Sequence, residues 1–192
     1  MSDQTLDRRV LAAVERLGRA LRAARQRSAT HHGLSLLGLS TIEILSDGRP
    51  RRIGALAAEL HVSQPTVSDA VTALHRRGLL VRERDPVDLR STLVTLSGRG
   101  AAVATAVEGE LRPLLAVESG TTVERAVTLR ILLAEISRLQ RAGVITINRS
   151  CLGCRHYDAT DATDPAWCLL LETTLRDEDL RVDCPEYEPA AP

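Results

Sequence analysis

Residues 53–96 carry the pattern that most narrowly limits the fold of this chain. Short helices are predicted over residues 53–60 and 64–77, separated by a three-residue turn. Ser63 is suited to cap the second helix, and Pro65 falls in its first turn, where the missing N–H costs nothing. The apolar residues of that helix recur at helical spacing at Val67, Val71 and Leu74. Together these features predict a helix-turn-helix.

A β-hairpin is predicted directly after this pair of helices. Its strands are the apolar runs at residues 79–81 and 92–96, and the second run alternates with a period of two. The polar, turn-rich residues 82–90 between them form a charged tip. A helix-turn-helix followed by such a hairpin is a winged helix-turn-helix.

The rest of the chain is predicted to be mostly helical. Apolar periodicity, caps and stop signals place helices over the residue ranges 5–28, 36–46, 98–117 and 122–141. The third is expected to bend near Pro113. The predicted fold class is therefore mostly α with a small β-wing, plus an irregular, cysteine-rich C-terminal segment.

Charge and aromatic residues are distributed unevenly. The formal net charge of the whole chain is zero, but it is +6 over residues 1–100, +1 over 101–150 and −7 over 151–192. Every basic residue is Arg, whose planar donors suit phosphates and guanine edges. The first 150 residues contain no aromatic side chain on which unpaired bases could stack. If the basic part binds nucleic acid, we expect the target to be double-stranded DNA.

No apolar run is long enough for a membrane span, and residues 1–9 are polar and charged, unlike a signal peptide. We therefore expect a cytoplasmic protein with no membrane partner.

The helix at 64–77 presents small polar residues on its outer face, which lets its backbone lie deep in a major groove. Gln64 can pair bidentately with adenine, and Asp69 can accept a hydrogen bond from cytosine or repel a misplaced phosphate. Arg76 and Arg77 suit phosphates, and an Arg at the tip of the wing suits a narrow minor groove. The predicted DNA-binding residues are Ser63, Gln64, Pro65, Thr66, Ser68, Asp69, Thr72, Arg76, Arg82, Arg84 and Arg90.

Three segments of this region resemble the MarR family of transcriptional regulators: Leu56–Ser68, Leu74–Leu80, and Asp88-Leu89-Arg90 leading into Val94–Ser97. The resemblance implies an obligate homodimer that recognises a pseudo-palindrome. It also implies that Arg90 enters the minor groove and that Asp88 supports the wing by a salt bridge to Arg90. Asp69 departs from the family pattern, in which many members carry a basic residue at this place.

The resemblance also divides the chain into four parts. Residues 1–33 are expected to form an N-terminal dimerisation helix, and residues 34–98 the winged helix-turn-helix domain. Residues 99–142 are expected to form the C-terminal dimerisation helices. Residues 143–192 lie outside the usual family pattern and are interpreted as a metal-binding tail.

All four cysteines lie in that tail, at Cys151, Cys154, Cys168 and Cys184. Such clustering in a cytosolic protein favours metal ligands over disulfides. Zn²⁺ sites with four thiolates use two paired knuckles, whereas only one pair exists here. A final Cys-Pro is common in iron–sulfur sites, so a [4Fe–4S] cluster is preferred and Zn²⁺ is the alternative. His156 is interpreted as a surface residue and Trp167 as the apolar anchor of the tail.

The leading functional hypothesis is a non-enzymatic, redox- or iron-responsive repressor. The alternative is a regulator of the same family with a structural zinc tail, sensing a small ligand or none. A lesser alternative is a redox enzyme that uses Cys151 and Cys154 as a dithiol, but the βαβ context of that chemistry is absent. His31 and His32 are interpreted as loop surface. An aromatic effector is disfavoured, and a small-molecule effector stays uncertain.

Overall fold

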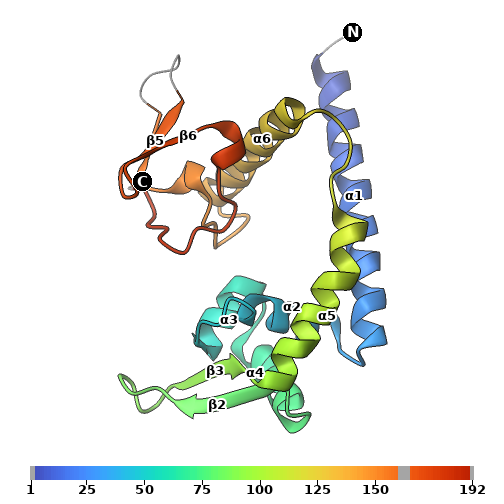
Figure 1. Ribbon diagram of the computed structural model, residues 1–192, viewed down its shortest axis with the longest axis vertical. Helices are drawn as coiled ribbons and strands as arrows, with labels where there is room; N and C mark the ends of the chain where they lie inside the picture. Colours follow the sequence, from blue (N-terminus) through green and yellow to red (C-terminus); the bar gives the residue numbers. More distant parts are fainter. Residues whose placement is uncertain (1–2, 160–164, 191–192) are drawn as a thin grey trace. The chain divides into compact units, whose positions relative to one another are not determined.

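The computed structural model describes residues 3–159 and 165–190 of the chain (Figure 1). The chain divides into two compact units, Met1–Ala116 and Val117–Pro192. Each unit has its own hydrophobic core, and each is described separately below.

In its described residues, the first unit contains five helices and a small sheet. The helices are α1 (Asp3–His31), α2 (Leu36–Leu45), α3 (Ile53–Leu60), α4 (Gln64–Arg76) and α5 (Gly98–Leu115). Helix α5 runs along the C-terminal half of α1 in Figure 1. These helices confirm the sequence prediction with small shifts at their ends.

The sheet of the first unit is the predicted wing with one added strand. Strands β2 (Leu80–Arg84) and β3 (Thr92–Leu96) pair antiparallel, with Leu80 opposite Leu96 and Arg84 opposite Thr92. The short strand β1 (Arg51–Arg52) pairs with the other edge of β3, giving the order β1-β3-β2. A two-residue strand has too little periodicity to be recognised in the sequence. It fixes the start of α3 against the wing.

Helix α4 is held by one buried face and two well-formed ends. Its residues Val67, Val71 and Leu74 are at most 3% exposed and pack into the core of the first unit. Ser63 is the N-cap, and its Oγ accepts a hydrogen bond from the N–H of Thr66. Since the apolar stripe faces inward, the remaining residues of the helix face outward.

The second unit joins the long helix α6 (Thr122–Arg141) to the cysteine-containing tail. The tail is not irregular as the sequence suggested, because it contains a three-stranded antiparallel sheet. Its strands, in the order β4-β5-β6, are β4 (Tyr157–Asp158), β5 (Ala166–Cys168) and β6 (Thr173–Leu175). Two single 3₁₀ turns, η1 (Cys151–Gly153) and η2 (Asp177–Asp179), complete it. Strands of two or three residues carry no readable sequence period.

A small core and one buried amide fix the tail on α6. Leu133 of α6 is fully buried with Cys151, Leu175 and Leu180. The side-chain amide of Asn148 donates to Ser137 Oγ (3.2 Å) and to Gln140 Oε1 (3.1 Å) on α6, while its oxygen accepts from the N–H of Ser150 (2.9 Å). Trp167 does not anchor the tail as expected, because it is 41% exposed.

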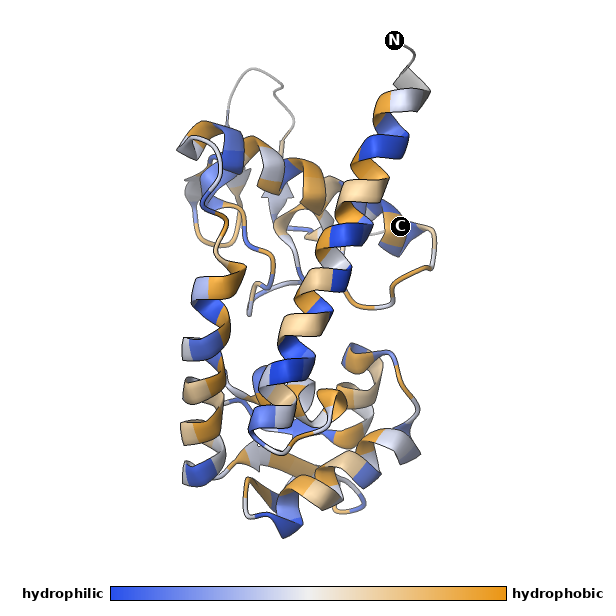
Figure 2. Cartoon of the chain, turned by 90° about the vertical axis from the view of Figure 1, so that its right-hand side faces the viewer, coloured by the Kyte–Doolittle hydropathy of each residue, from blue (hydrophilic) through white to orange (hydrophobic). Residues whose placement is uncertain are grey.

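Helix α1 carries an apolar stripe that its own unit leaves uncovered. The stripe is visible along the N-terminal turns in Figure 2, where each residue is between 42% and 63% exposed. Its members are Leu6, Val10, Leu11, Val14, Leu17 and Leu21. An apolar stripe repeated over several helical turns is a feature of helices that pack against another helix.

Within the described residues, no helix has the length and apolarity needed to cross a membrane.

The junction between the wing and α5 gives a test of the packing. A Cβ atom on Gly100, in the first turn of α5, would lie 2.0 Å from the carbonyl oxygen of Leu79. Gly100→Ala should therefore lower the free energy of unfolding by about 1–3 kcal/mol, measured by urea denaturation. Gly98→Ala is the matched control, since nothing lies within 4 Å of its added Cβ. Equal stability of the two variants would contradict this packing.

Candidate functional site

The outward face of α4 is the first candidate surface. Gln64, Thr66 and Asp69 are exposed there, and Ser68 and Thr72 are half-buried at its edge. The Ser63 and Thr66 hydroxyl oxygens lie 2.7 Å apart, so the cap also fixes the first outward side chain. The structure thus places the polar residues predicted from the sequence on one open face.

A groove connects this face with the wing. It is lined by Gln64, Pro65 and Ser68 of α4 and by Arg90 and Thr92 of the wing, with the first residues of α3 at its floor. Gln64 and Arg90 are 26 positions apart in the sequence, and the groove brings them to one surface. An amide and a guanidinium on one groove can both donate hydrogen bonds to base edges or phosphates.

The base of the wing is fixed by an ion pair that sequence reasoning missed. Arg52 Nε donates to Asp85 Oδ2 at 2.6 Å, and Asp85 is only 3% exposed. Asp85 Oδ1 also accepts from the N–H groups of Val87 and Asp88. These backbone hydrogen bonds and Arg52 hold the pKa of Asp85 below its usual range. Asp85-Pro86 is a turn signal that is visible in the sequence. Arg52, the ion-pair partner of Asp85, lies 33 residues away, so the pair could not be assigned.

Asp88 supports the wing differently from the expectation. Asp88 and Arg90, both within the described residues, do not form the predicted ion pair. Asp88 Oδ1 accepts instead from the backbone N–H of Arg90 (3.1 Å), and Oδ2 accepts from Ser91 Oγ (2.7 Å). The short turn directs the carboxylate to its own backbone, which leaves the exposed Arg90 side chain available to a ligand.

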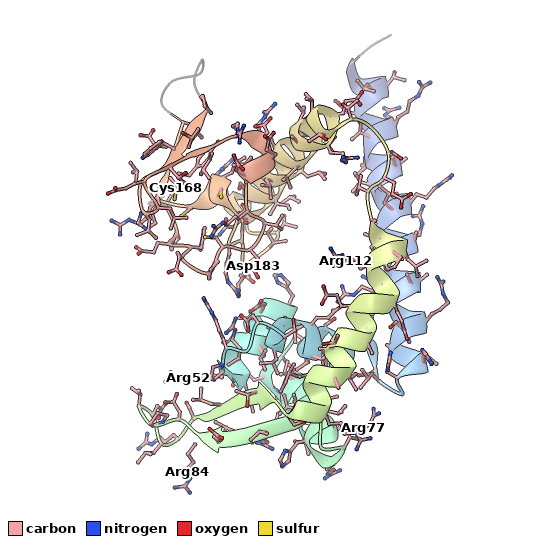
Figure 3. All side chains as sticks on the ribbon, in the orientation of Figure 1. Arg52, Arg77, Arg84, Arg112, Cys168 and Asp183 are labelled. Carbon is pink, nitrogen blue, oxygen red and sulfur yellow. The ribbon has the colours of Figure 1, made fainter. Side chains whose placement is uncertain are left out.

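The other predicted arginines separate into two groups. Arg76, Arg82 and Arg84 are exposed, and Figure 3 shows Arg84 extending outward from the hairpin. Arg77 has a structural role, because its guanidinium donates to the carbonyl oxygens of His32 and Gly33. The expectation that Arg77 contacts phosphate stays a prediction, and the structure adds this second role. Its hydrogen bonds tie the end of α4 to the end of α1.

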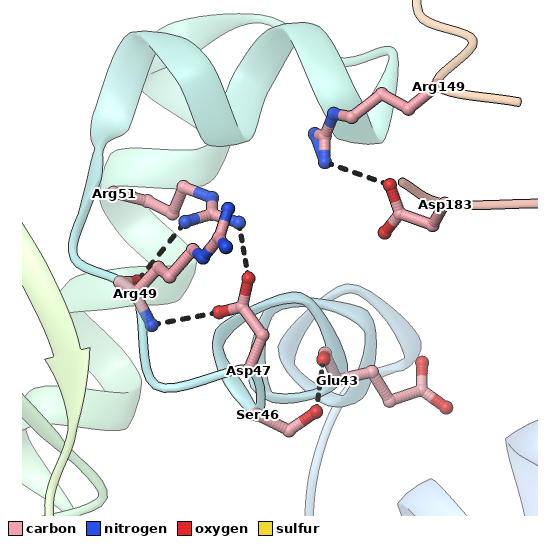
Figure 4. A network of polar contacts seen from close by, with 7 residues as sticks. All are labelled: Glu43, Ser46, Asp47, Arg49, Arg51, Arg149 and Asp183. Carbon is pink, nitrogen blue, oxygen red and sulfur yellow. Dashed lines mark hydrogen bonds and ion pairs between the residues drawn. The ribbon is translucent and has the colours of Figure 1, made fainter. Parts of the chain in front are cut away.

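The loop before β1 is ordered by a second carboxylate. Asp47 Oδ2 accepts from Arg51 Nη2 at 2.6 Å, and Asp47 Oδ1 accepts from the N–H of Arg49 at 2.9 Å (Figure 4). This turn directs Arg51 and Arg52 into the strand that pairs with β3. Arg52, whose side chain pairs with Asp85 at the base of the wing, is thus positioned by local hydrogen bonds in the preceding loop.

The first unit also contains a cavity of about 410 Å³ between α2 and α5. Its walls combine aliphatic residues such as Leu96, Val107 and Leu111 with the charged Glu43 and Arg112. None of its lining residues is aromatic, in agreement with the composition of this part of the chain.

The four cysteines form the second candidate site. All four line one small cavity in the second unit, together with His156 and Tyr157. Figure 3 shows sulfur atoms gathered near the labelled Cys168. His156 is not the surface residue expected, since its side chain is only 16% exposed and its Nε2 lies 3.4 Å from Glu188 Oε1.

Backbone pairing brings these distant cysteines together. Residues 149–155 run beside residues 181–190, where Cys151 N donates to Arg181 O and Cys184 N donates to Arg149 O. The side chains of Arg149 and Asp183 also pair at 3.3 Å (Figure 4). Cys168 reaches the same place because β5 sets it opposite Tyr157. The convergence predicted from the sequence is therefore present.

The spacing of the sulfur atoms bears on what the site can hold. No three of the four Sγ atoms, all in the described part of the chain, lie within 4.8 Å of one another. A single tetrahedral Zn²⁺ with Zn–S bonds near 2.3 Å requires S–S separations of about 3.8 Å. Burial raises the pKa of the Cys151 thiol, while the N–H of Arg181 donates to its sulfur at 3.2 Å. Binding of a metal as thiolate would therefore release a proton.

Comparison with known proteins supports the interpretation of the first unit. A family model described as the MarR family matches residues 32–91. The uncharacterised HTH-type transcriptional regulator ML2140 of Mycobacterium leprae is 33% identical over 128 residues, which cover 67% of this chain and 82% of the relative. The HTH-type regulator YkoM of Bacillus subtilis is 30% identical over 74 residues, 38% of this chain, and the match spans about half (48%) of the relative.

A solved structure shows the same fold. The crystal structure of the MarR family transcription regulator SP03579 has a TM-score of 0.65 and 24% identity to this chain. The match covers 73% of this chain and 95% of the solved one.

The carboxylate of Asp85 gives a pH-dependent test. Its pKa is lowered by folding, so it stabilises the protein above the unfolded value of about 3.9, and the contribution is lost as the pH falls through the lower folded value. Asp85→Asn should therefore have a lower urea midpoint than wild type near pH 7, and the difference should shrink below about pH 4. The exposed Asp69→Asn is the control and should leave the midpoint unchanged. A wild-type midpoint for Asp85→Asn at pH 7 would exclude a stabilising pair.

Proposed function

Because the chain belongs to the MarR family of transcriptional regulators, we propose that it is a repressor that binds a pseudo-palindromic duplex as a homodimer and carries a [4Fe–4S] cluster in its tail. The chain is a DNA-binding regulator and not an enzyme. Beyond family membership, we propose a homodimer, a pseudo-palindromic DNA site, and a signal to which the protein responds. The signal is the redox or iron state of the cell. The observation that carries the DNA part is the groove shared by Gln64, Ser68 and Arg90.

The arrangement of that groove supports reading of a duplex. The first turns of α4 carry the small side chains of Thr66, Ser68 and Asp69 beside its buried stripe, so its backbone could approach the base edges of a major groove. Arg90 extends from the turn of the wing, where an adjacent narrow minor groove would attract its charge. The Arg52–Asp85 pair keeps the wing at a fixed angle to α3 and α4.

The uncovered apolar residues support a homodimer. The residues of the stripe on α1 and Val123, Ile131 and Leu132 on α6 are large apolar side chains that are 42–71% exposed. A symmetric pair built from these helices would present two copies of α4 to two half-sites about 34 Å apart. A pseudo-palindromic site follows from that symmetry.

The geometry of the tail supports an iron–sulfur cluster rather than a single Zn²⁺. Four thiols face one cavity, and at least two of their sulfurs lie more than 4.8 Å apart, compared with about 3.8 Å around one tetrahedral Zn²⁺. In a [4Fe–4S] cluster each thiolate binds a different iron, so the ligands stand farther apart. Cys151, Cys154, Cys168 and Cys184 would hold the cluster, which would supply a redox-active and oxygen-sensitive centre.

The attachment of the tail to α6 supports a sensing role. The tail core consists of only a few buried side chains, so it depends on cross-links from a metal to stay folded. Cys151 belongs to the same core as Leu133 of α6. Loss of the cluster would therefore free a face of a helix that we assign to the dimer, and DNA binding would change with it.

Arg90→Ala tests the wing. The substitution should weaken binding to an operator-containing duplex by about tenfold or more, since it removes a charged contact to the minor groove. Fluorescence anisotropy over a range of salt concentrations would measure it, and the variant should also show a shallower dependence of affinity on salt. Arg8→Ala, near the N-terminal end of α1, is the control and should keep wild-type affinity. Wild-type affinity of Arg90→Ala at moderate salt would exclude the wing as a DNA contact.

Cysteine-to-serine variants test the cluster. Protein purified without oxygen should be brown and contain about four irons per chain, and each single Cys→Ser variant should lose most of that iron because a thiolate ligand is missing. Iron, zinc and acid-labile sulfide analyses with an absorption spectrum would measure this. Arg90→Ala should retain full iron content. A colourless protein with about one zinc per chain would instead establish the structural zinc alternative.

A further inference from the structure

Two adjacent histidines and a glutamate meet at the joint between α1 and α5. His31 is the last residue of α1, His32 follows it, and Glu110 lies on α5. His31 Nδ1 is 2.9 Å and His32 Nε2 is 3.1 Å from Glu110 Oε1. The two histidines are therefore not plain loop surface, since both rings are directed at one carboxylate. Among the described residues, this is the one group of three metal-ligating side chains whose ligand atoms all lie within 4.8 Å of one another.

The spacing of these atoms fits a single ion. With Zn–N and Zn–O bonds of about 2.0–2.2 Å, a tetrahedral ion separates its ligand atoms by about 3.4 Å. The two measured N–O distances are only a few tenths of an ångström shorter, so small side-chain rotations would open them to that value. Two imidazole nitrogens and one carboxylate form a ligand set that Zn²⁺ and similar divalent ions accept with a further position left open.

A hydrogen bond to its second oxygen also holds the Glu110 carboxylate in place. Ser28 Oγ, on a residue only 5% exposed, donates to Glu110 Oε2 at 2.8 Å. That hydrogen bond leaves Oε1 directed at the two rings. Outer hydrogen bonds of this kind orient the ligands of metal sites. His32 and Glu110 are partly covered, with side chains 17% and 35% exposed, whereas His31 is 72% exposed and leaves the site open to solvent.

We propose that His31, His32 and Glu110 form a binding site for a divalent first-row cation of the Zn²⁺ type, separate from the cysteine site. The site lies entirely within the first unit, so it does not depend on the tail. It is built from nitrogen and oxygen ligands, whereas the tail offers thiolates. The two sites therefore differ in the type of ligand that they offer to a metal.

The position of the site gives it a route to the DNA-binding helix. The carbonyl oxygens of His32 and Gly33 accept hydrogen bonds from the Arg77 guanidinium. Arg77 is the C-terminal cap of α4. A cation bound between His31, His32 and Glu110 would fix the chain segment that holds this end of α4. On the proposed function, cation binding would therefore change the affinity for DNA.

Isothermal titration with Zn²⁺ tests the site. The 192-residue chain is titrated near neutral pH, after the cluster in its tail has been loaded. Wild type should bind about one more ion per chain than Glu110→Gln, because the variant loses the carboxylate ligand. Ser28→Ala should keep all three ligands but weaken the affinity by roughly ten- to a hundredfold, since Oε1 is no longer oriented. Glu15→Gln, an exposed carboxylate on α1, is the control and should bind Zn²⁺ like wild type.

A second variant keeps the test valid if Glu110→Gln folds poorly. His31→Gln alters a largely exposed side chain and should lower the Zn²⁺ affinity at least tenfold while the circular dichroism spectrum stays that of wild type. Equal stoichiometry and affinity in wild type, Glu110→Gln and His31→Gln would overturn the proposal.

Anisotropy with duplex DNA, in the presence and absence of Zn²⁺, tests the route to α4. A shift in DNA affinity that occurs in wild type and is lost in His31→Gln supports it, and an identical response in both overturns it. The metal titration needs no DNA, so failure of the site and failure of the proposed function give different results.

Discussion

The surface that we propose to bind DNA depends on the burial of one helical stripe. Val67, Val71 and Leu74 occupy positions i, i+4 and i+7 of α4 and are almost inaccessible to solvent. Since they can be buried in only one orientation of the helix, the polar side chains of α4 must face outward. The same core contains Leu80 and Val94 of the wing, so the orientation of α4 and the position of the hairpin are set together. The Arg52–Asp85 pair then fixes the base of the hairpin.

The stability of the tail has a different basis, because the buried apolar cluster of the second unit is smaller than that of the first. The buried cluster around Leu133 is small, and the Asn148 hydrogen bonds and the backbone pairing beside the cysteines also order the segment. A segment of this kind gains most of its stability from a ligand. The two units thus differ in their cores: the first buries a large apolar cluster, and on the proposed function the second would gain stability from its metal.

Features local in sequence were predictable, and those joining distant residues were not. The helices, the wing and the Ser63 cap followed from periodicity and capping, and the four thiols were expected to converge. Asp85 and Arg52 lie 33 residues apart, and His31 lies 79 residues from Glu110, so neither partner could be assigned from the sequence. The prediction of an Asp88–Arg90 ion pair was wrong, because a carboxylate in a tight turn accepts hydrogen bonds from nearby backbone N–H groups. The tail strands were too short to show a pattern.

The exposed cations of α4 and the wing are all guanidinium groups, because these 192 residues contain no lysine. Lysine acylation, a common way for cells to neutralise a DNA-binding surface, therefore has no side chain to act on here. Arginine also stays charged at every physiological pH. The arginine charge of this surface therefore does not change with physiological pH, and on the proposed function control of its occupancy would come from changes in shape, assembly or metal content.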